Sequence, residues 1–260
     1  RFSLRWELTK VTRLVIITGA SAGIGADAAC AFAKQSAKLV LVGRNEQNLK
    51  QVANKCEGFT GIPALIIQAD ITIDANVQNI VEKTIEEFGR IDVLVNNAGV
   101  GVHGSILDGV ELFDNAMNLN MRSAYLLTGL AAPFLIESKG NIVNISSVAG
   151  LKPIKAFEYL PYSISKAAMD MFTKCVALEL GPKGVRVNSV NPGCTRTKFV
   201  VAAGFGANSE SLLDKFGSTL PMGKIAESDE VADLVVYLAS DRARSITGSI
   251  YVIDNGEMLL

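Results

Sequence analysis

The sequence predicts an α/β fold, a single-domain doubly wound parallel sheet of about seven strands with helices on both faces. Short apolar runs alternate strictly with longer segments of helical period, and this alternation implies right-handed βαβ crossovers. Most of the runs are continuously apolar, as expected of parallel strands that helices cover on both faces. No Pro/Gly/Ser linker, charge block or low-complexity tract divides the 260 residues, so one domain accounts for the chain.

The predicted elements follow one another in a regular order. The strands are Leu14–Thr18, Lys38–Val42, Ala64–Ala69, Val93–Asn96, Asn141–Ile145, Val185–Val190 and Ser249–Ile253. The helices are Gly25–Lys34, Asn45–Cys56, Asp74–Phe88, Glu111–Leu135, Pro161–Leu180 and Ser228–Ala239. In such a sheet ligands bind beyond the carboxyl ends of the strands, so the residues just after each apolar run are the candidate site.

The composition excludes two classes of protein. With 25 basic and 26 acidic side chains the formal net charge is −1, whereas a nucleic-acid-binding protein needs a surplus of Lys and Arg. No apolar run reaches the roughly 18 residues that cross a bilayer, because Thr128, Gly129 and Pro133 interrupt Leu126–Ile136. We therefore expect a soluble protein with no nucleic-acid partner and no membrane span.

The N-terminus and the cysteines favour a cytoplasmic location. Residues 1–11 are charged and lack the apolar core of a signal peptide, so we interpret them as an N-terminal extension or processing remnant that precedes a folded domain over 12–260. The four cysteines are scattered without metal-binding spacing, which suits a reducing compartment. Because His103 is the single imidazole, we expect no metal site.

A glycine-rich turn follows the first predicted strand. Gly19 allows a tight turn, Gly23 allows a close backbone approach to a pyrophosphate, and Gly25 allows the next helix to pack on the sheet. The helix N-terminus adds unpaired N–H groups and the positive end of a dipole. The turn predicts a dinucleotide site with contacts from Gly19, Ser21, Ala22, Gly23, Ile24 and Gly25. The alternative is a tight strand-to-helix turn that binds nothing.

A tyrosine and a lysine at helical spacing offer acid/base chemistry. Tyr162 and Lys166 are four residues apart just after Pro161, so they share one face of a predicted helix. A phenol has a pKa of about 10, and a neighbouring ammonium favours the phenolate, which predicts a lowered pKa for Tyr162. The pair can give a proton to a carbonyl oxygen during reduction. Tyr159 competes with Tyr162 but lacks a lysine four residues later.

A series of motifs between Thr12 and Gly256 resembles the classical short-chain dehydrogenase/reductase family. The motifs are the Gly-x3-Gly-x-Gly turn, Asn96-Asn97-Ala98-Gly99, the strand end at Ser147, Tyr162-x3-Lys166 and Pro192-Gly193. The resemblance implies a Rossmann fold in which 12–260 is an NAD(P)-binding catalytic domain. It also implies an oxidoreductase that transfers a hydride between the nicotinamide and a carbonyl or secondary alcohol.

The resemblance implies four catalytic residues, Asn120, Ser147, Tyr162 and Lys166. Tyr162 would be the general acid/base, Ser147 would donate a hydrogen bond to the substrate oxygen, and Lys166 would also bond the nicotinamide ribose. Asn120 would hold a helix distortion and a water that connects Lys166 to solvent. Two alternatives stay open: Asn118 takes this place, or Asn120 is a buried amide that bonds a helix carbonyl.

Cofactor contacts are implied at several further strand ends. Asp70 and Ile71 would contact the adenine, although Asp70 alternatively caps the following helix. Asn96 would brace the structure. The remaining contacts would come from Asn97, Ala98, Gly99, Tyr162, Lys166, Pro192, Gly193, Thr195 and Thr197.

The end of the second strand decides between the two cofactors. An acidic residue there would bond the ribose 2′-hydroxyl of NAD, but this sequence has Gly43, Arg44 and Asn45. Because Arg44 can bond a 2′-phosphate, NADP(H) is preferred over NAD(H). Alternatively, Arg44 is a solvated charge that pairs with Glu46. Ala22 also departs from the pattern, since many NADP-dependent relatives have a basic residue there.

Two loops, 151–160 and 198–222, are left to define the substrate. The second loop is long and apolar, so we expect it to be a lid over the substrate. We expect an apolar ketone, aldehyde or alcohol of steroid-like or 3-oxoacyl type. The apolar residues of this loop are Phe199, Val200, Val201, Phe205 and Leu212. We expect His103 at the rim of the pocket and Cys194 in a packing role.

By the habit of the family, helices Glu111–Leu135 and Pro161–Leu180 would join copies of the chain into a homotetramer or dimer. Two other functions stay open beside the NADP(H)-dependent enzyme. One is an NAD(H)-dependent alcohol dehydrogenase of the same family, and the other is a non-catalytic protein that senses dinucleotides.

Overall fold

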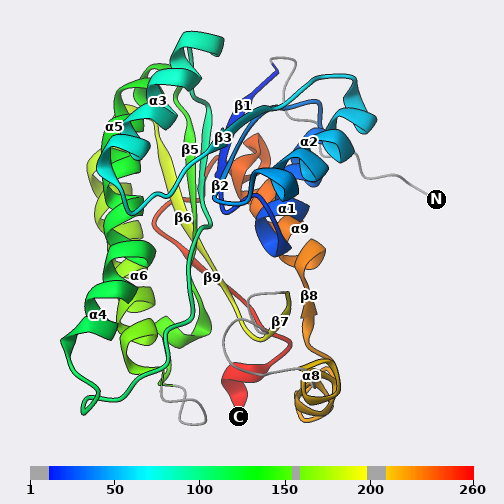
Figure 1. The fold of residues 1–260 in the computed structure, drawn as a ribbon, viewed down its shortest axis with the longest axis vertical. Helices are drawn as coiled ribbons and strands as arrows, with labels where there is room; N and C mark the ends of the chain where they lie inside the picture. The colour runs from blue at the N-terminus through cyan, green and yellow to red at the C-terminus, as the bar shows by residue number, and fades with distance from the viewer. Residues whose placement is uncertain (1–11, 154–158, 198–208) are drawn as a thin grey trace.

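A seven-stranded parallel sheet forms the centre of the molecule, with strand order β3-β2-β1-β4-β5-β6-β9 (Figure 1). The computed structural model describes residues 12–153, 159–197 and 209–260. The strands are β1 Leu14–Thr18, β2 Lys38–Gly43, β3 Leu65–Gln68, β4 Val93–Asn96, β5 Asn141–Ile145, β6 Arg186–Pro192 and β9 Ile250–Ile253. The predicted doubly wound parallel sheet is confirmed.

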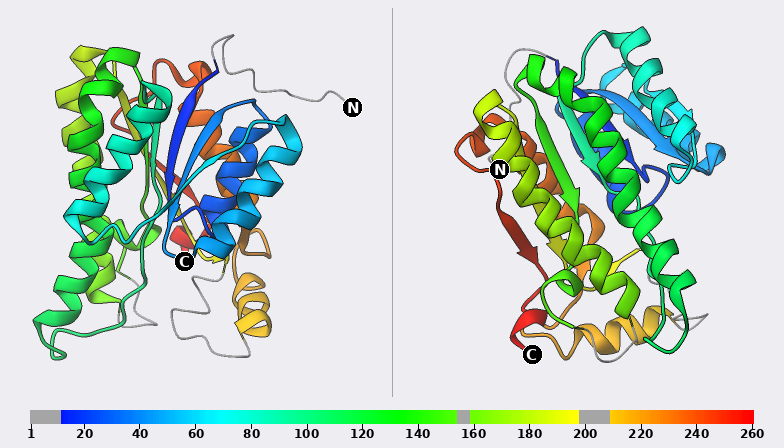
Figure 2. Two further views of the ribbon diagram at one scale, coloured as in Figure 1. Left: turned by 45° about the horizontal axis from the view of Figure 1, so that its top comes forward. Right: turned by 90° about the vertical axis from the view of Figure 1, so that its left-hand side faces the viewer.

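Helices cover both faces of the sheet, and each face has its own apolar core (Figure 2). One core lies under α1 Gly23–Ala33, α2 Glu46–Thr60 and α9 Ser228–Ala239. The other lies under α3 Asp74–Phe88, α5 Ser123–Ser138 and α6 Leu160–Leu180. Every residue of β1, β4 and β5 is buried, as expected of parallel strands that helices cover on both faces.

The order of the strands positions the site. β1 pairs with β2 on one side and with β4 on the other, and the crossovers to these two neighbours run on opposite faces of the sheet. The loops that follow β1 and β4 therefore diverge, and a crevice opens at the carboxyl ends of these strands. Among the described residues, no helix is long and apolar enough to cross a bilayer.

The helix predicted over Glu111–Leu135 is interrupted. It consists of α4 Val110–Met117, a π-helical turn over Asn118–Arg122, and α5, which continues to Ser138. Residue spacing alone could not reveal the extra residue of the π-helical turn, because the apolar pattern continues through it. The turn buries Asn120 at 1% exposure.

The segment predicted as the loop 198–222 contains a helix, α8 Ser209–Gly217, and residues 198–208 lie outside the described residues. Two short strands that the sequence did not predict, β7 Thr195–Arg196 and β8 Ala226–Glu227, pair beside it. The helix and the C-terminus both lie beyond the carboxyl ends of the main strands (Figure 1).

Two glycines in neighbouring helices make a matched test of the packing under the β1–α1 turn. A Cβ on Gly25 would lie 2.4 Å from the Gly19 carbonyl oxygen and 2.5 Å from Asn97 Nδ2, whereas a Cβ on Gly58 in α2 meets nothing within 4 Å. Gly25→Ala should lower the free energy of unfolding by about 1–3 kcal/mol. Gly58→Ala should raise it by about 0.5–1 kcal/mol, because glycine disfavours a helix interior. Urea denaturation measures both changes, and equal effects of the two substitutions would contradict the close packing.

Candidate active site

A cavity of about 1030 Å³ lies at the carboxyl ends of the strands and brings together nearly all of the predicted site residues. Residues from the ends of β1, β2, β3, β4, β5 and β6 line it, together with residues of α6 and α8. Two predicted residues do not line the cavity. Gly25 lies beneath the turn against Gly19, and Asn120 lies behind Gly99.

The β1–α1 turn has the form of an anion-binding site. Gly19 and Gly23 have φ values of 67° and 54°, a conformation that disfavours other residues. The N-cap of α1, Ala22, has no side chain that could bond the first N–H groups, and the first turn holds no acidic residue. These N–H groups and the positive end of the helix dipole therefore face the cavity, which fits the pyrophosphate of a dinucleotide.

The residues after β4 brace this turn. Asn97 Nδ2 donates to the Thr18 carbonyl at 2.8 Å, and the backbone N–H groups of Asn97 and Ala98 both donate to Thr18 Oγ1 at 3.0 Å. Asn96 bonds Thr128 Oγ1 and Asn144 Oδ1, at 3.1 and 2.9 Å, which confirms that it is a brace. The side chain of Asn97 is also a brace, so its contribution to the cavity lining is its backbone.

The end of β2 leaves a cation exposed at the cavity. A Cβ on Gly43 would lie 3.5 Å from Ser21 and from Leu49, so a small side chain would fit there without strain. Glu46 pairs with Lys50 at 2.6 Å, so the predicted alternative of a Glu46–Arg44 pair is wrong. The Arg44 carbonyl accepts a bond from Gln68, but its guanidinium has no ion pair among the described residues.

Asn45 caps α2, because its Oδ1 accepts from the backbone N–H of Asn48 at 2.9 Å. It also lines the cavity, next to Arg44. One side chain therefore fixes where the helix begins and places the arginine before it.

The end of β3 holds a carboxylate in a local turn. Asp70 Oδ1 accepts from the backbone N–H of Thr72 at 3.0 Å and from its hydroxyl at 2.7 Å. These bonds from Thr72 hold the pKa of Asp70 below its ordinary value. The N-cap of α3 is Ile73, so the alternative that Asp70 caps this helix is wrong. Asp70 and the buried Ile71 both line the cavity.

Ser147, Tyr162 and Lys166 converge on one wall of the cavity. The hydroxyls of Ser147 and Tyr162 are hydrogen-bonded to each other, and each residue is 8% exposed. Lys166 Nζ donates to the Ile145 carbonyl at 2.8 Å and lies 5.6 Å from the centre of the Tyr162 ring. The end of β5 and the first turns of α6 thus place a hydroxyl, a phenol and an amine together.

Burial controls the charge states of this cluster. Burial raises the pKa of Tyr162 to about 12, although the bond with Ser147 lowers it in part. Burial lowers the pKa of Lys166 to about 8, against the raising effect of the Asp170 carboxylate. The prediction that Lys166 lowers the pKa of Tyr162 is therefore wrong for the chain by itself, because burial raises this pKa and the group that lowers it in part is the Ser147 hydroxyl.

Asn120 ties the loop after β4 to α6. Its Oδ1 accepts from the Val100 N–H at 2.8 Å, and its Nδ2 donates to the Val100 carbonyl at 2.9 Å and to Ser165 Oγ at 3.0 Å. A Cβ on Gly99 would lie 3.2 Å from Asn120 Oδ1 and 3.4 Å from Lys166 Nζ. Asn120 thus bonds a loop rather than a helix carbonyl, and it is Asn120, not the half-buried Asn118, that faces Lys166.

The sequence interpretation missed a buried polar network behind the cluster. Asn191 Nδ2 donates to the Ser147 carbonyl and to Asp170 Oδ2, both at 2.9 Å, and Ser189 Oγ bonds Asp170 Oδ1 at 3.1 Å. Ser146 Oγ bonds the Lys166 carbonyl at 3.0 Å. Burial raises the pKa of Asp170. The sequence does contain a signal for this network, because Asp170 is an acid one helical turn after Lys166, on the helix face that packs on the sheet.

Aromatic and apolar side chains line the part of the cavity beside Tyr162. The rings of His103 and Tyr159 are 4.4 Å apart, and those of Tyr159 and Tyr162 are 5.5 Å apart. His103 is exposed and lines the cavity, as predicted for a residue at its rim. Burial raises the pKa of Cys194 to about 12, and the side chain packs beside Leu213, in agreement with the predicted packing role.

Known proteins resemble the chain along nearly its whole length. The family described as enoyl-(acyl carrier protein) reductase matches residues 19–257. An oxidoreductase of Thermotoga maritima is 38% identical over 247 residues, which cover 94% of this chain and 96% of that protein.

Solved structures agree with this result. A short-chain dehydrogenase/reductase of Caenorhabditis elegans superposes with a TM-score of 0.91 at 31% identity, covering 98% of this chain and 97% of the other. The L-sorbose reductase of Gluconobacter frateurii, solved with NADPH and L-sorbose, superposes with a TM-score of 0.88 at 28% identity. The match covers 99% of this chain and 100% of the other. The sheet order, the glycine turn and these matches agree, and the chain belongs to the short-chain dehydrogenase/reductase family of oxidoreductases, which bind a nicotinamide dinucleotide.

Proposed function

We propose that the protein is an NADP(H)-dependent dehydrogenase/reductase that acts on a carbonyl or secondary alcohol of an apolar small molecule. The observation that carries this proposal is the convergence of Ser147, Tyr162 and Lys166 on the cavity that the glycine turn opens into. A phenol, a hydroxyl and an amine beside a dinucleotide site are the groups that carbonyl reduction requires. When bound, the dinucleotide supplies or accepts the hydride.

Tyr162 is the proton donor in this proposal. The phenol is protonated near neutral pH, as its pKa above the ordinary value of about 10 requires, and it can give its proton to a carbonyl oxygen as negative charge develops there. Ser147 adds a hydroxyl beside the phenol that can bond the same oxygen. Ser147 follows β5 and Tyr162 belongs to α6, and the network around Asp170 holds these two elements together.

Lys166 and Asn120 support the proton donor. An ammonium close to the Tyr162 ring favours the phenolate that remains after proton transfer. Lys166 would also bond the ribose on the nicotinamide side. Asn120 holds Val100, and so fixes the loop through Gly99 against the amine. The role of the π-helical turn is to bring Asn120 to this position.

Arg44 supports the preference for NADP(H) over NAD(H). It follows β2 at the cavity and forms no ion pair among the described residues, although its charge helps to lower the pKa of Asp70, and Gly43 supplies no carboxylate to repel a 2′-phosphate. The L-sorbose reductase of similar structure was solved with NADPH. On the cofactor side, Gly23 and Thr197 enclose the turn, since a Cβ on Gly23 would lie 3.1 Å from the Thr197 methyl.

The apolar character of the substrate rests on the described wall of the cavity. Leu212, Leu213 and Phe216 of α8 line it. Phe199, Val200, Val201 and Phe205, on which the sequence prediction also relied, lie outside the described residues. We propose an apolar ketone or its alcohol, of the steroid-like or 3-oxoacyl type.

We further propose a cytoplasmic homo-oligomer, a tetramer or dimer. The outer faces of α5 and α6, which run side by side (Figure 2), expose apolar side chains that a second copy would cover. Tyr125 is 65% exposed and Leu178 is 81% exposed. Residues 1–11, proposed to be an extension or processing remnant, lie outside the described residues.

Turnover of a carbonyl panel tests the enzyme against the dinucleotide sensor. With NADPH, the wild-type protein should reduce at least one of a set of aliphatic, cyclic, steroid and 3-oxoacyl carbonyls. Tyr162→Phe should lower kcat by about 10²- to 10⁴-fold, while the Kd for NADPH changes by no more than about twofold. Tyr159→Phe should keep most of the kcat, because no lysine follows Tyr159 by one helical turn. Tight NADPH binding without turnover of any carbonyl would identify a sensor.

Cofactor choice is tested at Arg44. Arg44→Ala should raise the Kd for NADPH by about ten- to a hundredfold, since charge-assisted bonds to the 2′-phosphate are lost, and should change the Kd for NADH by less than about threefold. Lys50→Ala is the matched control, because Lys50 is an exposed cation of α2 that is already paired with Glu46. Equal losses for the two cofactors in Arg44→Ala would contradict the phosphate contact and favour the NAD(H)-dependent alternative.

The burial of Lys166 predicts a pH dependence of stability. The folded chain has a pKa of about 8 for this amine against an ordinary value of 10.5, so between these values the unfolded chain binds more protons. Stability from this group therefore rises with pH. Between pH 7 and 9.5, the free energy of unfolding should increase by about 2 kcal/mol relative to Lys166→Met, as measured by urea denaturation. A constant difference would mean that the amine stays hydrated.

A further inference from the structure

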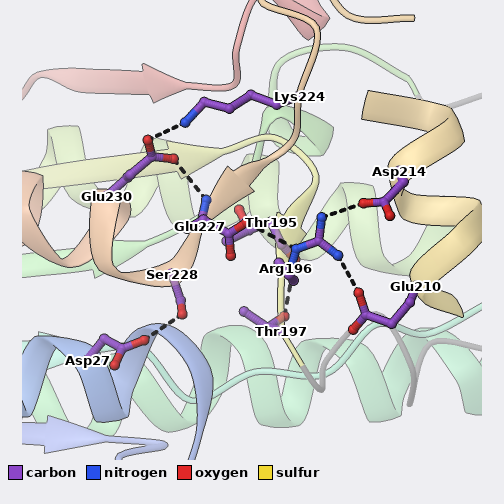
Figure 3. Close-up of polar contacts among 10 residues, drawn as sticks. All are labelled: Asp27, Thr195, Arg196, Thr197, Glu210, Asp214, Lys224, Glu227, Ser228 and Glu230. Atoms are coloured by element: carbon purple, nitrogen blue, oxygen red, sulfur yellow. Dashed lines mark hydrogen bonds and ion pairs between the residues drawn. The ribbon is translucent and has the colours of Figure 1, made fainter. Parts of the chain in front are cut away.

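A single arginine holds three carboxylates at the edge of the cavity (Figure 3). Arg196 in β7 bonds Glu227 of β8 through Nε at 3.0 Å and Asp214 of α8 through Nη2 at 2.7 Å. Its Nη1 bonds Glu210, also of α8. All three nitrogens of the guanidinium are engaged, and two of the three acids belong to one helix.

That helix forms a wall of the cavity. Leu212, Leu213 and Phe216 of α8 line the cavity, and Leu213 is 2% exposed where it packs with Leu220 and Ile225. An isolated helix of nine residues is unstable in water, so its attachments decide where it lies. The ion-pair group of Arg196 attaches α8 through two of its acids, in addition to the small apolar cluster around Leu213.

The neighbours of Arg196 in the chain belong to the cofactor side. Thr195 and Thr197 both line the cavity, and Thr197 lies against Gly23 of the β1–α1 turn. Arg196 therefore joins the strand beside the dinucleotide turn to the helix that bounds the substrate end. Each exposed ion pair is weak alone, but one planar guanidinium shared by three acids fixes α8 in distance and in rotation. The three carboxylates also raise the pKa of Arg196.

We propose that Arg196 is a positioning residue that holds α8 as the wall of the substrate end, so that substrate affinity depends on this ion-pair group while cofactor affinity does not. The proposal rests on the proposed function. It requires that loss of the arginine loosens α8 without moving Ser147, Tyr162 or Lys166, none of which contacts the ion-pair group.

Steady-state kinetics of Arg196→Gln at saturating NADPH test it. The KM for the carbonyl should rise by about three- to tenfold, which corresponds to the loss of a few exposed charge pairs. The kcat and the Kd for NADPH should each stay within about twofold. Arg196→Lys should give an intermediate KM, because one ammonium cannot bond three separate acids in the same geometry.

Lys224→Gln is the matched control. Lys224 forms an exposed ion pair with Glu230 at 2.6 Å in the same region, but neither residue belongs to α8 (Figure 3). Its substitution should leave the KM within about twofold. The double variant Glu210→Gln/Asp214→Asn should raise the KM as Arg196→Gln does, and adding Arg196→Gln to it should bring little further change, since the partners act together.

Hydrogen exchange supplies a readout that needs no turnover. In Arg196→Gln the amides of Ser209–Gly217 should lose protection, while those of α1 and α6 keep theirs. An unchanged KM together with unchanged exchange in α8 would overturn the proposal, as would a Kd for NADPH that rises as much as the KM. If the wild-type protein reduces no carbonyl, the proposed function fails, and exchange in α8 still decides whether Arg196 holds the helix.

Discussion

The site depends on the contact between the β1–α1 turn and the end of β4. Gly19 and Gly25 approach each other and Asn97 so closely that a Cβ on either glycine would overlap backbone or amide atoms. Asn97 and Thr18 then close the gap with hydrogen bonds between two strands that are distant in sequence. This contact leaves the first N–H groups of α1 directed into the cavity. It also fixes the position of the loop through Gly99, which lies next to Lys166.

A second constraint is the polar network under Ser147 and Lys166. The two residues come from different elements, yet Ser146, Asn191 and Asp170 join their backbones through buried bonds. Buried polar groups that are all paired stiffen a structure, because each would lose its partner if an element shifted. The distance between the Ser147 hydroxyl and the Lys166 amine is therefore fixed by buried hydrogen bonds of the core and does not depend on the conformation of a loop.

Much of this could be predicted from the sequence, because glycine spacing, strand periodicity and the Tyr-x3-Lys pair are local patterns. The bounds of β1, β4, β5, α3 and α9 agree with prediction for this reason. The π-helical turn at Asn118–Arg122 could not be found in this way, since it adds a residue without breaking the apolar pattern. Arg196 and its acids were also hidden, because their pairing depends on how α8 folds back on β7.

The error over Tyr162 has a more general cause. Spacing indicates that an amine is near a phenol, but it does not measure how much water both groups lose, and here desolvation is the larger effect on each pKa. The result is a phenol that keeps its proton and an amine whose pKa of about 8 lies nearer to neutral pH than its ordinary value. In the chain by itself Tyr162 is therefore the neutral phenol, the form that the proposed carbonyl reduction requires of its proton donor. In the proposed reaction, oxidation of an alcohol would start from the phenolate, which burial of Tyr162 disfavours in the chain by itself.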